Sequence, residues 1–245
     1  MSQAIQLSVV IPVYNEADNL APLLAEVCAA LDGTLHYEII VVDDGSADDT
    51  SARLRTLQAQ LPALRVLRHA RNYGQSAALR SGIRAARAAW VGTLDGDGQN
   101  DPTDLLRLWR QLHGYPEAQR PRLLAGQRQH RQDDWLRRLS SRIANAVRGR
   151  LLGDATPDTG CGLKLIQRQA FLELPFFDHM HRFLPALIQR DGGRVVSVPV
   201  NHRPRRHGRS KYGVWNRLWV GIVDLAGVLW LIRRGCVAAV EEEKN

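Results

Sequence analysis

The sequence predicts an α/β fold with a mainly parallel sheet flanked by helices. Runs of consecutive apolar residues recur along the first half of the chain, and such runs are typical of strands buried on both faces of a sheet. Segments with apolar residues every three or four positions separate the runs, as amphipathic helices require. Strands that alternate with helices through short connections form parallel sheets covered on both faces.

The first half of the chain contains four predicted strands, and a helix follows each of them. The strands are residues 7–13, 38–42, 65–68 and 90–94, and all but the short third one are apolar for most of their length. Leucine spacing and an Ala-rich stretch place the helices at residues 20–31, 54–61, 76–89 and 102–112. The last helix has a clear start, because Asp101 can cap it and Pro102 occupies its first position.

The pattern is less regular after Gly114. Residues 116–121 resemble a linker, and residues 123–126 and 194–200 are candidate strands. Residues 163–166 are predicted to form an edge strand. A helix predicted around residues 136–147 carries arginines on its outer side, for which a solvated basic face is the commoner explanation.

Composition limits the class of partner. The chain has 245 residues, of which 44% are hydrophobic, enough for one large domain or two small ones. The net charge of +8 indicates an anionic partner such as a nucleotide, a nucleic acid or an acidic membrane surface. Cys28, Cys161 and Cys236 have no metal-binding spacing and fit a reducing compartment. The first residues lack the pattern of a signal peptide, so none is expected.

The fourth strand ends in two carboxylates, Asp95 and Asp97, set among glycines. Residues i and i+2 at a strand end point the same way, so these side chains can converge on one point. Convergent carboxylates repel each other unless a cation lies between them, and Mg²⁺ commonly takes one or two protein carboxylates plus substrate phosphates. Gln99 can point the same way again. On spacing alone, a solvated turn rich in Asp and Gly is an equal alternative.

Polar residues follow the other three strands as well. In open parallel sheets, ligands bind outside the carboxyl ends of the strands. Four polar loops at one edge therefore favour binding of a phosphate-bearing small molecule over a solvated turn. The loops contain Asn15 and Glu16, Asp43 and Asp44, Arg71 and Gly74, and Asp95 and Asp97.

A basic segment and an apolar segment lie next to each other near the end of the chain. Residues 201–213 contain five cations and two histidines, which indicates an anion-binding loop or a disordered basic segment. Residues 214–232 are strongly apolar with three tryptophans, but Arg217 and Asp224 are costly at mid-bilayer. Tryptophan with flanking arginine is typical of helices in the membrane interface. An interfacial helix is therefore expected ahead of a buried one, and both ahead of a spanning one.

Four segments in order resemble a known family. They are VVIPVYNE at residues 9–16, VDDGSADDT at residues 42–50, Arg71-Asn72-Tyr73-Gly74, and Asp95-Gly96-Asp97-Gly98-Gln99. Together they resemble the family-2, inverting glycosyltransferases of GT-A (Rossmann-like) fold. Gln99 and the pattern Arg205-x-x-Gly208-x-Ser210-Lys211 are similar to the polyprenyl-phosphate branch, typified by dolichol-phosphate mannose synthase and bacterial undecaprenyl-phosphate relatives. The resemblance covers residues 7–213.

The resemblance implies roles for individual residues. Asp95, Asp97 and Gln99 would hold Mg²⁺ or Mn²⁺, with Asp97 the most direct ligand. The nucleotide sugar would be bound by Pro12, Tyr14, Glu16, Asp43, Asp44, Arg71, Gly74, Asp95, Gln99 and Arg128. The acceptor phosphate would meet Arg137, Arg205, Ser210 and Lys211. Asp97, Arg205 and Lys211 are the predicted catalytic residues.

The resemblance also implies an organisation for the chain. Residues 1–213 would form one GT-A domain, with a nucleotide-binding half (1–114) and an acceptor half (115–213). Residues 214–245 would add an apolar, membrane-interfacial helix and a charged tail. One departure concerns the segment that starts at Asp158, where the branch commonly has an aromatic residue and arginine after Asp-Thr-Gly. We predict that Lys164 takes over the role of that arginine.

The implied activity is transfer of a sugar from a UDP- or GDP-sugar to undecaprenyl or dolichyl phosphate, for cell-envelope glycan or lipid modification. The enzyme would work at the cytoplasmic face of the cell membrane, peripheral or weakly anchored. The acceptor is already anionic, so it needs positioning by cations rather than a base. An alternative is a transferase with a saccharide or soluble acceptor, for which Asp158 is the candidate base. A nucleic-acid-binding protein is a remote alternative, because stacking aromatics are scarce among the basic residues.

Overall fold

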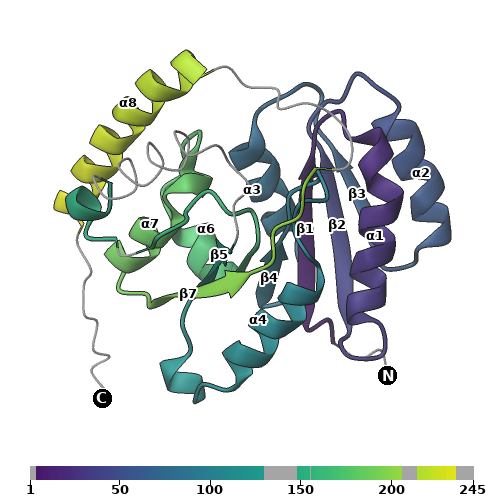
Figure 1. Ribbon diagram of the computed structural model, residues 1–245, viewed down its shortest axis with the longest axis horizontal. Coiled ribbons are helices and arrows are strands. Elements are labelled where there is room, and N and C mark those ends of the chain that lie inside the picture. Colours follow the sequence, from purple (N-terminus) through teal and green to yellow (C-terminus); the bar gives the residue numbers. More distant parts are fainter. Residues whose placement is uncertain (1–3, 130–147, 155, 206–213, 236–245) are drawn as a thin grey trace, which may run out of the picture.

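The computed structural model describes residues 4–129, 148–154, 156–205 and 214–235. Within them a seven-stranded sheet has the strand order β3-β2-β1-β4-β6-β5-β7, and helices cover both of its faces (Figure 1). This confirms the predicted α/β class. The strands are β1 (Leu7–Val13), β2 (Tyr37–Asp43), β3 (Leu64–Arg68), β4 (Trp90–Thr93), β5 (Leu123–Arg128), β6 (Lys164–Gln167) and β7 (Val195–Val200). The main helices are α1 (Ala17–Leu31), α2 (Thr50–Gln60), α3 (Gln75–Ala85), α4 (Thr103–His113), α6 (Arg168–Glu173), α7 (Leu184–Arg190) and α8 (Val214–Arg233).

The first four strands form a parallel sheet, as predicted. β1 pairs with β2 on one side and with β4 on the other, and β2 pairs with β3, all in parallel. In this register Val13 lies opposite Asp43, and Val10 lies opposite Thr93. The polar residues that follow β1, β2 and β4 therefore come to one edge of the sheet.

The prediction of an edge strand at residues 163–166 is wrong. β6 lies inside the sheet between β4 and β5, and it runs antiparallel to both. The polar Lys164 and the short length of the segment are typical of an edge strand. In the structure, however, Lys164 is buried with only 5% of its surface exposed. The edge strands are β3 and β7, and β7 pairs with β5 in parallel.

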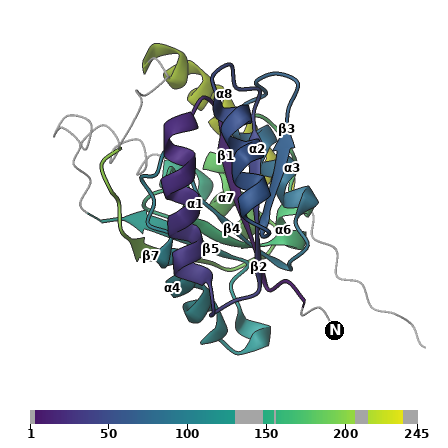
Figure 2. The same ribbon diagram turned by 90° about the vertical axis from the view of Figure 1, so that its right-hand side faces the viewer.

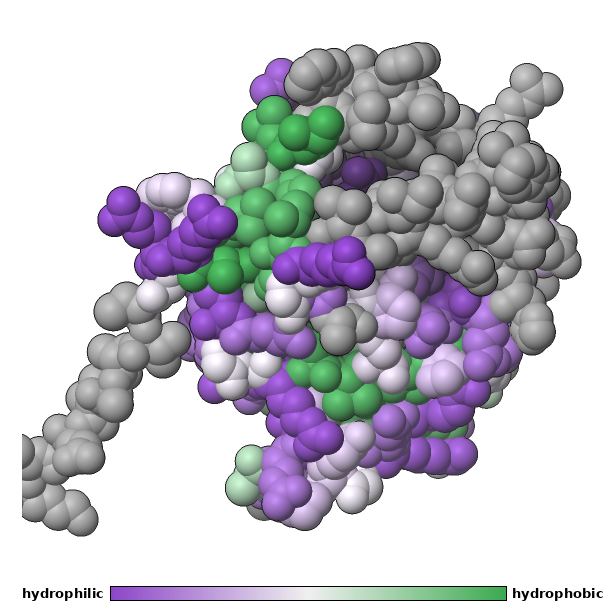
Figure 3. Space-filling model, turned by 60° about the vertical axis from the view of Figure 1, so that its left-hand side comes forward, coloured by the Kyte–Doolittle hydropathy of each residue, from purple (hydrophilic) through white to green (hydrophobic). Residues whose placement is uncertain are grey.

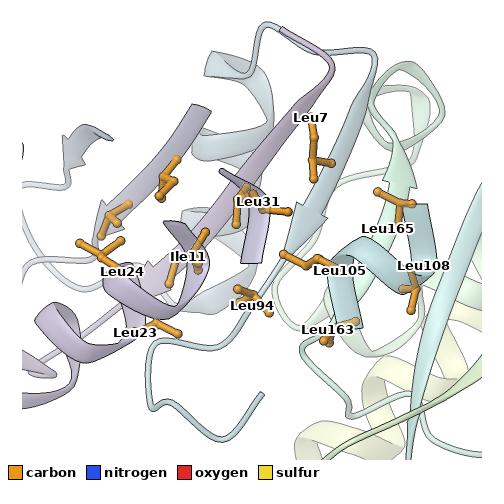
Figure 4. Packing of buried hydrophobic residues seen from close by; sticks show 14 of the residues in the cluster. Leu7, Ile11, Leu23, Leu24, Leu31, Leu94, Leu105, Leu108, Leu163 and Leu165 are labelled. Atoms are coloured by element: carbon orange, nitrogen blue, oxygen red, sulfur yellow. The ribbon is translucent and has the colours of Figure 1, made fainter. Parts of the chain in front are cut away.

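The two faces of the sheet carry separate hydrophobic layers. On one face, alternate residues of β1 such as Val9 and Ile11 pack with leucines of α1, α2 and α4 (Figure 4). Figure 2 shows α1 and α2 in front of the strands. On the other face, Val10, Ile40 and Val42 pack with α3, α6 and α7. Burial of β1 on both faces explains its unbroken apolar sequence.

α8 lies at the end of the molecule opposite α1 and α2 (Figure 1). Its inner side packs against the rest of the chain through Val228, which is fully buried, and Asp224 Oδ2 lies 3.2 Å from His179 Nδ1. Its outer side exposes Val223 and Trp230, at 66% and 61% of their surface. Across the described residues, no helix has the length and apolarity needed to cross a membrane.

Candidate active site

The acidic pair lies on a turn that other residues hold in shape. The backbone N–H of Asp95 donates to Asn100 Oδ1 at 2.8 Å, and that of Gln99 donates to Asp97 Oδ1 at 3.1 Å. Asn100 also forms an antiparallel bridge with His202. The turn after β4 is therefore joined to the segment after β7, so that the donor half and the acceptor half of the predicted site meet here.

Asp95 is closely surrounded. Burial raises the pKa of Asp95 to about 6, and the neighbouring charge of Asp97 adds to this effect, against the opposing charges of Lys164 and Arg128. Gln75 Nε2 donates to Asp95 Oδ1 at 2.9 Å. A Cβ atom at Gly162 would lie 2.1 Å from Asp95 Oδ2. Only glycine at position 162 therefore lets the Asp95 carboxylate occupy this place.

A cation of the chain contacts the acidic pair. Arg205 Nη2 lies 3.4 Å from Asp97 Oδ2 and 2.9 Å from Glu16 Oε1. One guanidinium thus joins the loop after β1 to the turn after β4. The contact shows that the carboxylate of Asp97 accepts a positive charge at this point. A metal ion bound to Asp97 would compete with Arg205 for the same oxygen.

The residues present fit a hard divalent cation such as Mg²⁺ or Mn²⁺. Asp95 and Asp97 offer carboxylate oxygens, which such ions prefer, and their mutual repulsion would be relieved by a positive charge. Among the residues that the structure describes, no group of three or more His, Cys, Asp or Glu side chains could hold a metal ion. The pair therefore suits an ion that takes further oxygen ligands from a substrate diphosphate.

Gln99 links the acidic turn to the basic segment. Its side-chain Nε2 donates to the carbonyl of Arg203 at 3.3 Å, and the N–H of Arg203 donates to the carbonyl of Gln99 at 2.9 Å. Arg203 is held in turn by ion pairs with Glu26 (2.6 Å) and Asp101 (2.9 Å). The structure therefore fixes the backbone that leads to Arg205.

The loops after β1 and β2 are fastened to each other. Asn15 has a left-handed backbone, with φ of 52°, and its side chain accepts a hydrogen bond from the N–H of Ala47 at 2.7 Å. The N–H of Asn15 donates to Ser46 Oγ at 2.9 Å, and the N–H of Glu16 donates to Thr50 Oγ1 at 3.0 Å. The two predicted nucleotide loops thus form one unit.

Asp43 and Asp44 are both buried, and their carboxylates fix neighbouring loops. Asp44 accepts hydrogen bonds from the N–H groups of Tyr73 (2.9 Å) and Gly74 (2.8 Å) and contacts His69 Nδ1 at 2.6 Å. Asp43 accepts from the N–H of Ser46 at 2.9 Å and from the hydroxyl of Ser51. Both carboxylates therefore fix the backbone of the loops around the site. This role is separate from any contact with a nucleotide.

Arg128 and Asp158 form a buried bidentate ion pair. Arg128 Nε and Nη2 lie 2.7 Å and 2.8 Å from the two carboxylate oxygens of Asp158. Burial by itself lowers the pKa of Arg128, but the pair with Asp158 outweighs it and raises the pKa. Both carboxylate oxygens of Asp158 are thus engaged by the guanidinium of Arg128.

A cavity of about 290 Å³ lies beside Asp95. It extends between α3 and the segment that joins α6 to α7, and Gln75, Lys164, His181 and Arg182 supply polar lining. Sequence reasoning named neither Gln75 nor His181 as site residues. These residues come from distant parts of the chain, so no local motif connects them; a glutamine at the start of a helix and a histidine before Arg182 carry no signal on their own.

The structure brings most of the predicted residues to one edge of the sheet, but three lie outside its described part. Pro12, Tyr14, Glu16, Asp43, Asp44, Gly74, Asp95, Asp97, Gln99, Arg128 and Arg205 are at or near the carboxyl ends of β1, β2, β4, β5 and β7 or in the loop before α3. Arg71 is exposed and its guanidinium lies 5.0 Å from the Tyr73 ring centroid. Arg137, Ser210 and Lys211 are outside the described residues.

The sequence that forms this fold and the acidic turn matches a known protein family. Residues 8–174 match the pattern of glycosyl transferase family 2. The chain therefore belongs to this family of sugar-transferring enzymes.

Named relatives narrow the comparison. A dodecaprenyl-phosphate galacturonate synthase of Rhizobium johnstonii is 37% identical over 236 residues, which are 94% of this chain and 68% of the relative. An undecaprenyl-phosphate 4-deoxy-4-formamido-L-arabinose transferase of Edwardsiella ictaluri is 39% identical over 212 residues, 85% of this chain and 63% of the relative. The chain thus spans about two thirds of the length of these curated relatives.

Solved structures share the fold. Glucosyl-3-phosphoglycerate synthase of Mycobacterium tuberculosis, in complex with Mn²⁺, UDP-glucose and glycerol 3-phosphate, superposes with a TM-score of 0.68 at 20% identity, covering 96% of this chain and 82% of that one. A mannosyltransferase of Pyrobaculum calidifontis, in complex with GDP-mannose and Mn²⁺, gives a TM-score of 0.67 at 20% identity and covers 97% of this chain and 67% of that one. The GT-A fold expected from the sequence is thereby confirmed.

Proposed function

We propose that this protein transfers a sugar from a nucleotide-diphosphate donor to a polyprenyl phosphate and forms a lipid-phosphate sugar. The observation that carries the proposal is the position of Arg205, which contacts both the loop after β1 through Glu16 and the acidic turn through Asp97. The basic segment thus begins at the donor edge of the sheet, where two phosphate-bearing substrates would have to meet. The relatives that use dodecaprenyl and undecaprenyl phosphate support the same class of acceptor.

The proposed chemistry is an in-line displacement at the sugar carbon. A Mg²⁺ or Mn²⁺ ion held by Asp95 and Asp97, with Gln99 nearby, would neutralise the charge that builds on the leaving nucleoside diphosphate. The loops that contain Glu16 and Asp44 would position the nucleotide. Arg205 and the basic residues beyond it would bring the acceptor phosphate to the donor, and this electrostatic placement supplies most of the catalysis.

The ion pair of Asp158 with Arg128 favours a phosphate acceptor over a saccharide hydroxyl. A hydroxyl acceptor needs a base to remove its proton, and Asp158 was the candidate. Its carboxylate is occupied by the bidentate pair with Arg128. A phosphate monoester is already ionised and needs no such base, so the observed pairing does not hinder the proposed reaction.

The outer side of α8 supports a membrane-surface location. Figure 3 shows hydrophobic surface along this part of the molecule, bordered by hydrophilic residues. Ile222, Val223 and Trp230 contribute exposed apolar area, and Arg233 and Arg234 follow at the end of the helix. An apolar face next to basic residues suits binding to the interface of an anionic bilayer. We place the enzyme at the cytoplasmic face of the cell membrane, where its lipid acceptor would be presented.

The proposed activity is tested by incubation with Mn²⁺, UDP- and GDP-sugars and a short-chain polyprenyl phosphate. A lipid-phosphate sugar should form, and thermal-shift measurements should show that the matching donor raises the melting temperature only when Mn²⁺ is present. No glycolipid with any donor, together with no stabilisation by any nucleotide, would refute the proposal.

The location is tested separately by co-sedimentation with vesicles that contain anionic lipid. Replacement of Val223 and Trp230 by serine should lower the bound fraction, because both side chains expose apolar area to solvent. Replacement of the exposed Arg84 on α3 by glutamine serves as a control for loss of general positive charge. Equal binding of wild type and the serine variant would contradict the role given to α8.

A further inference from the structure

The cavity beside Asp95 is suitably placed for the sugar of a nucleotide-sugar donor. Its volume of about 290 Å³ is close to the lower end of the usual range for small-ligand pockets, about 300–1,000 Å³. Asp95 forms part of its wall, so the cavity starts at the acidic pair proposed to seat the diphosphate through a metal ion. Because the sugar is bonded directly to that diphosphate, the side chains of this wall are the ones that it would meet.

His181 and Ser76 connect the wall of this cavity to the start of α3. His181 lines the cavity and is partly exposed, whereas Ser76 is buried, with 1% of its surface exposed. Nδ1 of His181 lies 2.7 Å from Ser76 Oγ, and the backbone N–H of His181 donates to the same oxygen at 3.3 Å. The imidazole is thus held at Nδ1. Among the residues that the structure describes, Nε2 of His181 has no hydrogen-bond partner.

The contacts of Ser76 determine which nitrogen of His181 carries the proton. A serine hydroxyl can donate one hydrogen bond, and a buried hydroxyl that donates none is costly. In the described part of the chain, the Ser76 hydroxyl is hydrogen-bonded to no acceptor other than Nδ1 of His181. Nδ1 therefore accepts the hydroxyl proton, and Nε2 carries the proton of the imidazole.

The imidazole of His181 is also uncharged. Burial of the ring lowers the pKa of His181 well below its usual range, and the positive charges of Arg182 and Lys164 act in the same direction. Nδ1 faces Ser76, which is not part of the cavity lining, so Nε2 is the ring nitrogen available to the cavity. His181 thus offers a neutral N–H donor to the occupant. Such a donor suits an uncharged hydroxyl oxygen, whereas a phosphate oxygen is bound more strongly by a cation.

We propose that the Nε2–H of His181 donates a hydrogen bond to a hydroxyl group of the donor sugar, and that Ser76 positions the ring and fixes its tautomer. The inference rests on the proposed function, because it assigns one contact of the same donor. His181 is thus a sugar-binding residue, and Ser76 is a positioning residue. A sugar with no hydroxyl at this place would leave the N–H unpaired, so the contact discriminates among donors.

Two substitutions of His181 separate this role from a purely structural one. The side-chain oxygen of asparagine is as many bonds from the backbone as Nδ1 is. His181→Asn can therefore still accept from Ser76, but it has no N–H in the place of Nε2. Glutamine behaves in the opposite way, because its amide nitrogen is as many bonds from the backbone as Nε2 is. His181→Gln therefore keeps a donor for the cavity and loses the contact with Ser76.

Calorimetric titration with Mn²⁺ measures the binding of UDP-glucose, UDP-galactose, UDP-galacturonate and GDP-mannose, with free UDP and GDP as references. For the donor that the wild type binds most tightly, His181→Asn should weaken binding roughly tenfold, as expected for one lost hydrogen bond. The affinity for free nucleotide should not change, and His181→Gln should retain most of the donor affinity. His113→Asn, the same substitution at an exposed position outside the cavity lining, is the matched control and should bind like the wild type.

Two results of this titration would overturn the inference. One is wild-type donor affinity in His181→Asn, which would show that the contact with Ser76 is the only role of the side chain. The other is an equal loss for donor and free nucleotide, which would show that His181 does not act on the sugar.

Nitrogen-15 NMR of the histidine side chains tests the tautomer without a donor. The signal that disappears in His181→Asn or His181→Gln belongs to His181, and in the wild type it should show a proton on Nε2 and none on Nδ1. Ser76→Ala should give a mixture of the two tautomers, and addition of the donor to the wild type should shift the Nε2 signal more than the Nδ1 signal. A proton on Nδ1 in the wild type would overturn the inference, whatever the variants show about binding.

Transfer assays separate this inference from the proposed function. Sugar transfer to polyprenyl phosphate, together with wild-type donor affinity in His181→Asn, would overturn the inference and leave the proposed function in place. The expected tautomer and a donor-specific loss of binding in His181→Asn, without transfer to any polyprenyl phosphate, would support the role of His181 and refute the proposed acceptor.

Discussion

The two halves of the sheet fix their site residues with opposite kinds of group. In the parallel half, the buried carboxylates of Asp43 and Asp44 and the partly buried side chain of Asn15 accept hydrogen bonds from backbone N–H groups of nearby loops. In the half that contains β5, β6 and β7, the partly buried Arg128 and the buried Lys164 fix their neighbours by donating hydrogen bonds. Arg128 pairs with a carboxylate, and Lys164 donates to backbone carbonyls.

The difference has an energetic consequence. An aspartate that accepts backbone N–H groups still accepts hydrogen bonds when it is replaced by asparagine. A buried cation whose only strong partner is removed is left with an uncompensated charge, which is far more costly. We therefore expect the second half of the sheet to be the less tolerant of single substitutions, even though the first half contains the recognisable motifs.

The largest effect is expected where the two halves meet, at Asp97. Asp97→Ala removes the carboxylate that contacts Arg205 and is the most direct predicted metal ligand. Sugar transfer should fall by roughly 10² to 10³-fold, as for loss of one strong electrostatic contact to the leaving group. Transfer at saturating donor and direct titration with Mn²⁺ would measure it. Asp18→Asn, which alters an exposed carboxylate, is the control; unchanged transfer in Asp97→Ala would remove the basis of the proposed function.

A large loss of stability is expected from Asp158→Asn. The substitution leaves the Arg128 guanidinium buried without its anion, for which about 3–5 kcal/mol is typical. The exposed pair of Arg53 and Asp18, with side chains 49% and 64% exposed, should contribute only about 0–1 kcal/mol when Asp18→Asn breaks it. Urea unfolding of the two variants gives both values. Similar losses in the free energy of unfolding for the two variants would contradict the larger contribution assigned to the pair of Arg128 and Asp158.

An intermediate effect is expected from Gly162→Ala. The added methyl group would collide with the Asp95 carboxylate, 2.1 Å away, so either the Asp95 side chain or the backbone around Gly162 must move. Overpacking of this kind costs about 1–3 kcal/mol, and the displaced carboxylate should also weaken Mn²⁺ binding. Gly221→Ala, at a helical position with open space around it, is the matched control and should not destabilise the protein. Normal metal affinity in Gly162→Ala would contradict the placement of Asp95.

The smallest effect concerns Glu38, in the parallel half. Burial alone raises its pKa, but hydrogen bonds from Arg65, the N–H of Arg87 and Ser8 outweigh burial and lower it. The pKa of Glu38 is therefore lower in the folded protein than in the unfolded chain. The contribution of Glu38 to the free energy of unfolding is complete above about pH 4.3, and it is lost as the pH falls through the folded-state pKa. Glu38→Gln should flatten this acid branch of the stability curve. Melting temperatures between pH 3 and pH 7 test it, and an unchanged branch would contradict the assignment.

The first half of the fold was predictable because its information is local. β1, β2 and β4 are mostly apolar runs inside the sheet, and the acidic turn directly follows β4, so Asp95 and Asp97 could be placed from the sequence. The second half depends on partners far apart in the chain. The sequence pattern around Lys164 suggested an exposed edge, whereas the strand lies between β4 and β5.

The candidate site divides in the same way. Its motif residues were predicted, but the cavity wall combines Gln75, Lys164 and His181 from three separate segments, and no spacing rule connects them. The pairing of Arg128 with Asp158 also escaped prediction, because each residue had a plausible separate role. The contacts of these residues depend on which segments lie next to each other in the folded sheet. The sequence alone does not give that arrangement.

The carboxylate of Asp44 has one further consequence. It holds the N–H groups of Tyr73 and Gly74 and also contacts His69, whose Nε2 lies 2.8 Å from Ser81. The loop before α3 is therefore ordered before any substrate arrives. An incoming nucleotide would not have to restrict the motion of this loop, so little of its intrinsic affinity would be lost to ordering the protein. Fast exchange of donor and product is then compatible with accurate positioning of the sugar.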